Sequence, residues 1–294
     1  MYLNCFETVT NTTNRRRQSR ILLKCTFLIL LFVLANRSYE LSAQTGSPLS
    51  SWQYSAGEVM AKYGGPLPDW RVMLGAVGSI APTFEGSDKY KIMPGGFLDV
   101  RFRDLAFLST GEGVGVNLLR GMNYRAGISL GYDTGRKDDN DHGIKGLQEV
   151  SPAPEIKAFG EIFIMPVALT FNFRRAVGGH NGWIGDIGFY IPLFEGGGFI
   201  LFAGPSVTFV NSEYMNAYFD VSQEDSSKSG LPPYDANACC KNANFGITAL
   251  YYITEKIFII SEISYERLLS DAEESPVSQK DNLFAADFGL VYSF

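Results

Sequence analysis

Histidine is scarce in this chain, which has only two in 294 residues. A catalytic triad needs a histidine beside a nucleophile, and a zinc site usually needs one beside further ligands. His142 and His180 both lie in segments that read as loops, and neither has such company in the sequence. We therefore interpret both as solvated loop side chains and predict no catalytic, cofactor-binding or metal-binding residue.

Cysteine is almost as scarce, with four residues. Cys5 and Cys25 lie near the amino terminus, so only the adjacent pair Cys239 and Cys240 belongs to the body of the chain. Neighbours in sequence rarely bridge each other because the ring would be strained, and one pair cannot form a disulfide framework. We interpret the pair as loop residues without a metal or redox role.

Charged residues make up only 19% of the chain, and the mean hydropathy is close to zero. This value excludes a helical membrane protein with many spans. The 31 Gly, 22 Phe and 15 Tyr are nevertheless many for a soluble enzyme of this size. A β-barrel in lipid predicts such a mixture, because each strand has an apolar outer face and a polar inner face.

The amino terminus has the pattern of a targeting segment. Basic residues from Arg15 to Lys24 precede an apolar run, Phe27–Ala35, which is too short to span a bilayer as a helix. We predict a signal peptide over residues 1–43, with a short membrane anchor as the alternative. Residues 44–69 are polar and rich in Gly and Pro, which predicts a flexible lead-in, and residues 70–294 form the predicted barrel.

The predicted mature chain is acidic. Removing residues 1–43 takes away six basic and two acidic residues and leaves 19 basic against 29 acidic, a net charge of −10. Nucleic acid is therefore excluded as a partner.

Residues 283–294 show the alternation on which the fold prediction rests. Phe284, Phe288, Leu290 and Tyr292 share one parity with Phe294, whereas Asp287 and Ser293 fall on the other. This is the period of a β-strand with one apolar face. Aromatic carboxy-terminal strands are typical of bacterial outer-membrane barrels, and a soluble sandwich seldom leaves such a strand as an open edge.

The same alternation recurs along the chain and predicts an all-β fold, a transmembrane antiparallel up-and-down β-barrel of about twelve strands. Short periplasmic turns would alternate with long extracellular loops, and no helix of useful length is expected. Residues 105–119 could form two strands, or one strand with a bulge at Gly111–Gly113. The predicted strands are 70–84, 90–102, 105–110, 113–119, 123–135, 155–163, 166–175, 183–193, 199–211, 243–254, 257–269 and 283–294.

Charges of both signs occupy the polar parity, which predicts a charged lumen. They could pair into ladders that close the barrel or line a narrow aqueous path, and inward aromatic side chains would help to fill the space. The predicted inward charges are Arg71, Asp99, Arg101, Arg103, Arg125, Asp133, Lys157, Glu161, Arg174, Asp186, Glu262, Glu266 and Asp287. The predicted inward aromatics are Phe97, Phe159, Phe163, Phe202 and Tyr252.

Two short motifs resemble ligand sites but lack their full pattern. Asp138-Asp-Asn-Asp141 does not have the ligand spacing of an EF-hand, so we interpret it as a solvated or lipopolysaccharide-facing acidic loop. Gly111-Glu-Gly-Val-Gly115 resembles a phosphate-binding loop, but no helix follows it. Its glycines are better explained as turn and strand positions.

Several segments together carry a resemblance to a known family. They are Phe84–Asp88, Gly113–Leu119, Gly131–Arg136, Gly146-Leu147, Tyr218–Ser222, Tyr234–Ala236, Leu268–Val277 and Val291–Phe294. From Trp70 to the end, the chain resembles the MipA/OmpV family, the MltA-interacting outer-membrane proteins. One departure is that Cys239 and Cys240 stand where small residues such as Gly are expected.

The resemblance implies an outer-membrane β-barrel of a Gram-negative bacterium, in contact with outer-membrane lipid and lipopolysaccharide. It implies a non-enzymatic scaffold that links a lytic murein transglycosylase to a peptidoglycan synthase, without a cofactor. Other members are described as porin-like or adhesive, so a small diffusion porin or an adhesin is the alternative. An outer-membrane lipid-modifying enzyme is a third hypothesis, against which the lack of a plausible His and Ser pairing counts. The sequence leaves the oligomeric state open.

Overall fold

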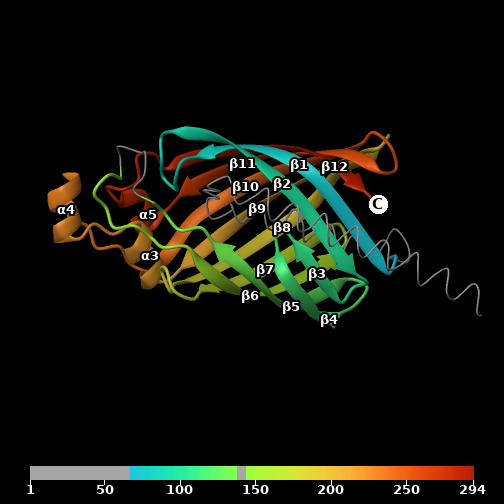
Figure 1. The fold of residues 1–294 in the computed structure, drawn as a ribbon, viewed down its shortest axis with the longest axis horizontal. Helices are drawn as coiled ribbons and strands as arrows, with labels where there is room; N and C mark the ends of the chain where they lie inside the picture. The colour runs from blue at the N-terminus through green and yellow to red at the C-terminus, as the bar shows by residue number, and fades with distance from the viewer. Residues whose placement is uncertain (1–66, 138–143) are drawn as a thin grey trace, which may run out of the picture. The chain divides into compact units, whose positions relative to one another are not determined.

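The computed structural model describes residues 67–137 and 144–294. In this part of the chain, twelve antiparallel strands form one closed barrel, in which consecutive strands pair and β1 pairs with β12 (Figure 1). The strands are β1 (Trp70–Pro82), β2 (Tyr90–Phe102), β3 (Ala106–Ser109), β4 (Gly113–Arg120), β5 (Tyr124–Asp133), β6 (Ala153–Ile164), β7 (Val167–Ala176), β8 (Trp183–Gly196), β9 (Phe199–Val210), β10 (Cys239–Tyr252), β11 (Ile257–Leu268) and β12 (Asn282–Ser293). The predicted fold class and strand number are confirmed.

Some predictions concern residues outside the described part. They are the signal peptide over residues 1–43, nearly all of the lead-in over residues 44–69, the acidic run Asp138–Asp141, and His142.

The alternation of side chains decides which face of each strand is covered. Along β5, for example, Leu130 is 59% exposed on the outside, whereas the adjacent Ser129 is 3% exposed on the inside. Exposed Ile, Leu, Phe, Trp and Tyr side chains recur on the outer face of almost every strand. The charged parity points into the lumen, where its members are mostly buried. An apolar outer face with a polar interior is the arrangement of a barrel in lipid.

The two ends of the barrel differ in the length of the connections between strands. At one, the turn end, the strands are joined by residues 103–105, 121–123, 165–166, 197–198 and 253–256. At the other, the loop end, most connections are longer, at residues 83–89, 134–152, 177–182, 211–238 and 269–281. Short turns on one side and long loops on the other match the prediction.

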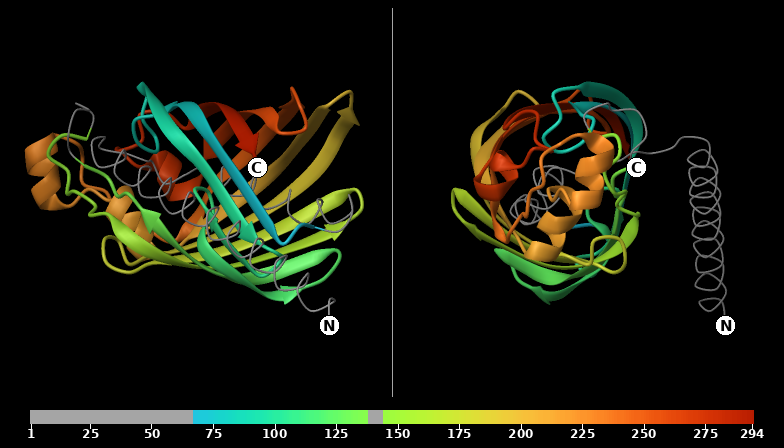
Figure 2. Two further views of the ribbon diagram at one scale, coloured as in Figure 1. Left: turned by 45° about the vertical axis from the view of Figure 1, so that its right-hand side comes forward. Right: turned by 90° about the vertical axis from the view of Figure 1, so that its left-hand side faces the viewer.

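The loop end contains short helices that the sequence analysis did not predict. They are α3 (Ser212–Tyr218), α4 (Gln223–Ser229) and α5 (Ser270–Glu274). The side chains of Asn211 and Ser222 cap α3 and α4, because each accepts a hydrogen bond from a backbone N–H group of the first turn. Asn and Ser are favoured at this position. Seen from the loop end, the helical segment of the β9–β10 loop lies over the ring of strands (Figure 2). Among the described residues, no helix has the length and apolar character to cross a membrane.

The barrel wall is shortest at β3 and β4, which have four and eight residues. Residues 105–119 form two strands joined by a tight hairpin, which settles the question of a bulge, and β3 has only four residues. It pairs with β2 only over Asp99–Phe102, and the described chain places no strand beside Lys91–Gly96 on that side. Pro94 fits this edge, because proline has no N–H to donate to a neighbouring strand.

Candidate functional site

A network of buried ion pairs crosses one side of the lumen from β2 to β6. Arg125 of β5 binds Glu161 of β6 through two hydrogen bonds, at 2.7 and 2.8 Å, and binds Glu112 at 2.5 Å. Glu112 also pairs with Arg101 of β2, which in turn binds Asp99 at 2.8 Å. All five side chains are almost completely buried. Each guanidinium therefore compensates two carboxylates, as buried charges require.

Glu112 reaches the lumen because of the β3–β4 hairpin. Gly113 has a φ of +80°, and a Cβ atom there would lie 2.1 Å from the carbonyl oxygen of Leu130, so only glycine fits. The hairpin places Glu112 between the arginines of β2 and β5. The rings of Phe107 and Phe159 lie 5.7 and 5.1 Å from the Arg125 guanidinium and pack beside the network.

A second group of charges continues around the wall. Arg174 of β7 lies 3.1 Å from Asp186 of β8 and 3.7 Å from Glu155 of β6. The hydroxyl of Thr208 on β9 donates to Asp186 at 3.1 Å. Polar contacts between side chains therefore follow the inside of the barrel from β2 to β9.

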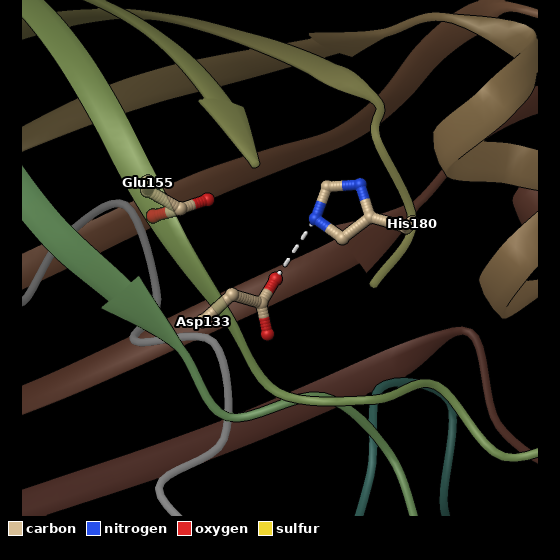
Figure 3. A group of neighbouring side chains, drawn as sticks. All are labelled: Asp133, Glu155 and His180. Atoms are coloured by element: carbon tan, nitrogen blue, oxygen red, sulfur yellow. Dashed lines mark hydrogen bonds and ion pairs between the residues drawn. The ribbon is translucent and has the colours of Figure 1, made fainter. Parts of the chain in front are cut away.

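At the loop end, His180 joins three parts of the chain. It comes from the β7–β8 loop, is 5% exposed, and contacts Asp133 at the end of β5 with 3.0 Å between Nε2 and Oδ2 (Figure 3). The hydroxyl of Tyr218 on α3 donates to the same carboxylate at 3.1 Å. Burial, together with the Asp133 charge, raises the pKa of Tyr218 well above its ordinary value. The prediction that His180 is a solvated loop side chain is therefore wrong, because the loop folds back into the barrel mouth.

Asp133, Glu155 and His180 bring three possible metal ligands within 4.8 Å of one another (Figure 3). The hydrogen bonds of His180 and Asp133, however, engage atoms that a metal would need, whereas Glu155 Oε1 is buried without a hydrogen-bond partner. The backbone N–H of Gly182 donates to His180 Nδ1 at 2.9 Å, so Nε2 carries the ring proton and donates to Asp133. Both oxygens of Asp133 are already acceptors. These hydrogen bonds join the β7–β8 loop and α3 to the end of β5, and a metal ion bound to His180 and Asp133 would have to break them.

An apolar cluster lies between α3 and the strand ends below it. It is built on Tyr214, Met215 and Phe219, which are buried against Leu268 and Leu283. Beside it, the ammonium of Lys241 pairs with Glu85 of the β1–β2 loop at 2.5 Å. Burial opposes the charged form of Glu85, but the Lys241 charge and several hydrogen bonds outweigh it and hold the pKa below its ordinary value. This cluster packs the β9–β10 loop against the mouth of the barrel.

Most of the predicted lumen residues lie where the parity places them. The structure brings Asp99, Arg101, Arg125, Lys157 and Glu161 together with Asp133, Arg174 and Asp186 on one side of the lumen, and Phe97, Phe159 and Phe163 are buried. Two of the predicted positions differ.

Arg103 and Tyr252 are the exceptions. Arg103 lies in the β2–β3 turn, where its side chain is 61% exposed and pairs with Asp69, because the strand ends one residue earlier at Phe102. Tyr252 has the inward parity and its ring lies 5.2 Å from that of the buried Phe258, but it is 39% exposed because it lies at the turn end of β10.

The cysteine pair is also placed differently from the prediction. Cys239 and Cys240 are free thiols that begin β10, so they belong to a strand and not to a loop. A register shift follows between Cys240 and Asn242, which explains why the alternation was not recognised before residue 243.

Four parts of these sites were not predicted from the sequence: Glu112, Glu85, Lys241 and the aromatic residues of α3. All lie in connections or at strand ends, where period-2 alternation carries no information. The one signal that was available for Glu112 is its place as a single acidic residue between two glycines.

Comparisons with known proteins identify a family match over nearly all of the barrel. The family model of "MltA-interacting protein MipA" matches residues 74–294. YiaT of Escherichia coli (strain K12), named as an outer membrane protein, is 24% identical over 114 residues. That match covers 39% of this chain and about half, 46%, of the relative.

Two solved structures resemble the chain in fold. The COG4313 outer membrane channel from Pseudomonas putida F1 has a TM-score of 0.43 and 12% identity, with 78% of this chain and 97% of that chain covered. The NanC porin has a TM-score of 0.41 and 8% identity, with 74% and 98% covered.

Proposed function

The chain belongs to the family of MltA-interacting protein MipA, and from this premise we propose that it is a non-enzymatic scaffold of the outer membrane. In this role, the barrel anchors murein-processing enzymes, a lytic murein transglycosylase first among them, at the inner surface of the membrane. The single observation that supports a scaffold over a pore is the buried network around Arg125 and Glu112. Paired, buried charges along one side of the lumen have a structural task, which supports a barrel that holds its shape rather than one built to pass a solute.

In this proposal the partner docks at the turn end, which faces the periplasm in barrels of this type. This end consists of the short turns between strands. Their residues include Asp104, which lies beside Arg103, and the exposed Met165. Murein lies on the periplasmic side, so an enzyme that acts on it can reach this end and not the loop end.

Site-specific photo-crosslinking in cells tests the proposal. A photoreactive amino acid at Asp104 in the β2–β3 turn is expected to capture a lytic murein transglycosylase. The matched control is Ser226 on α4, at the opposite end of the barrel, which should capture none. Capture from Ser226 with none from Asp104, Met122 or Met165 would refute the scaffold role at this face.

We also propose that residues 1–43 are removed as a signal peptide and that residues 44–69 form a periplasmic lead-in. The support is the basic and then apolar pattern of the amino terminus. Amino-terminal sequencing of the protein from the outer-membrane fraction is expected to begin near Gln44. An intact Met1 would refute the cleavage.

A small cation channel is the second candidate. It is favoured by two acidic side chains on the opposite side of the lumen, Glu262 and Asp287, which no basic residue of the described chain pairs with.

A further inference from the structure

The lumen face of β11 and β12 differs from the network side. Glu262 of β11 and Asp287 of β12 are directly opposite each other in the antiparallel register, and both have the inward parity. Glu262 is 4% exposed, whereas Asp287 is half-buried. Directly opposed side chains in such a pair have Cβ atoms about 4.5–5.5 Å apart, and like charges there destabilise the sheet. Two carboxylates at this distance need a counter-charge or a proton between them.

The described residues supply no counter-charge to this pair. In the described part of the chain, no Lys, Arg or His forms an ion pair with Glu262 or Asp287, in contrast with Glu112 and Glu161. The Oε2 atom of Glu262 is buried and has no hydrogen-bond partner. Asp287 accepts one hydrogen bond, from the hydroxyl of Ser79 on β1. A buried, unpartnered carboxylate oxygen that faces a second carboxylate is a site with an unmet demand for positive charge.

The neighbouring inward positions offer oxygen atoms. Thr248 of β10 is the register partner of Glu262, and Ser79 is that of Asp287. Ser264 is the next inward residue of β11. Carboxylate and hydroxyl oxygens, with no sulfur or imidazole among these residues, are ligands that suit a hard cation such as Ca²⁺.

The apolar residues on the turn-end side of Glu262 and Asp287 increase the need of this pair for positive charge. Phe258 of β11 and Val291 of β12 face inward there and form an apolar cluster with Phe97 of β2. Apolar surroundings lower the local dielectric constant, so the repulsion between two bare carboxylates is less screened. The half-buried Asp287 leaves the pair open to ions in the lumen.

We propose that Glu262 and Asp287, with the hydroxyls of Ser79 and Thr248, bind one hard divalent cation of the calcium type inside the barrel. The site lies near the middle of β11 and β12 and joins them to β1 and β10. The cation therefore stabilises the part of the wall where β12 closes on β1. The proposal is independent of the scaffold role.

Calcium binding to the full-length mature barrel, refolded in detergent without lipopolysaccharide, tests the site. Isothermal titration with CaCl₂ at pH 7.5 is expected to give one saturable site per barrel. Glu262→Gln and Asp287→Asn should each weaken binding at least tenfold, and Thr248→Val should weaken it less. The control Glu224→Gln removes an exposed carboxylate on α4 and should leave the site intact. Heat-modifiable electrophoretic mobility confirms that each variant is folded.

Unfolding provides a second readout, which keeps the test decisive if one variant folds poorly. Calcium is expected to raise the urea midpoint of the wild type and of Glu224→Gln, and to leave that of Glu262→Gln unchanged. Calcium binding of equal strength in the wild type and Glu262→Gln would overturn the proposal. So would a wild type that binds no calcium and becomes more stable on Glu262→Gln, because the two carboxylates then share a proton instead of a metal ion.

Discussion

At the scale of single residues, parity predicted the interior well where strands are regular and failed where the chain turns. Arg101, Arg125 and Glu161 face the lumen as predicted, because each lies inside a strand whose alternation is unbroken. The prediction that Arg103 faces the lumen was wrong, because alternation has no meaning beyond the last paired residue of β2. The prediction that His180 is solvated was wrong, because a polar loop sequence does not reveal whether the loop folds into the barrel mouth.

The first prediction concerns Arg125. Arg125→Ala leaves Glu161 buried without its ion-pair partner and Glu112 with Arg101 alone, which should lower the free energy of unfolding by about 3–5 kcal/mol. Urea unfolding of the refolded barrel in one lipid measures the change. The control is Lys228→Ala, which breaks an exposed i,i+4 pair with Glu224 and should leave the free energy of unfolding nearly unchanged. Equal effects of the two substitutions would contradict a structural role for the buried network.

The second prediction compares adjacent residues of β10. Ile247→Arg places a charge on the outer face, where Ile247 is exposed, and should cost about 2–4 kcal/mol near the bilayer midplane. Thr248→Arg points inward and directly opposes Glu262, so the new charge gains a partner and should cost less. Urea titrations of both variants in the same lipid decide the order. A larger cost for Thr248→Arg would mean that the assignment of the two faces is wrong.

At the scale of elements, the strands could be predicted to within a few residues because period 2 and turn residues are local signals. The three helices of the described chain could not, since each has only five to seven residues. Side chains cap α3 and α4, and α3 and α5 bury side chains at the mouth, which no local pattern reveals. The short β3 was predicted as a weak point, but only the pairing shows that it contacts four residues of β2.

The third prediction concerns the seam at which β1 closes on β12. A Cβ atom at Gly75 would lie 2.5 Å from the carbonyl oxygen of Leu290 on β12, so Gly75→Ala forces the two backbones apart. We expect a loss of about 1–3 kcal/mol and a smaller folded fraction. Gly78→Ala, on the same strand, meets no atom within 4 Å and serves as the control. The ratio of folded to unfolded bands in unboiled samples measures closure, and equal ratios would show that the seam tolerates the added atom.

At the scale of the whole molecule, the sequence predicted an even number of strands and an apolar outer surface, from which a closed barrel follows. It left open whether the lumen is closed, because that depends on which charges meet across the barrel. The meeting of Glu112 with two arginines is set by the β3–β4 hairpin, and the cap on the mouth is set by α3 and Glu85. The contacts of α3 and Glu85 have no local signal in the sequence, and the position of Glu112 between two glycines does not reveal which arginines it meets.

The central claim, that this outer-membrane barrel is a closed scaffold and not a pore, is tested most directly by its conductance. The purified barrel, refolded and inserted into a planar lipid bilayer, is expected to give no regular single-channel steps. Its insertion is verified independently by heat-modifiable mobility after recovery from vesicles of the same lipid. Uniform, repeated conductance steps from the folded wild type would contradict the account and establish an open path through the lumen.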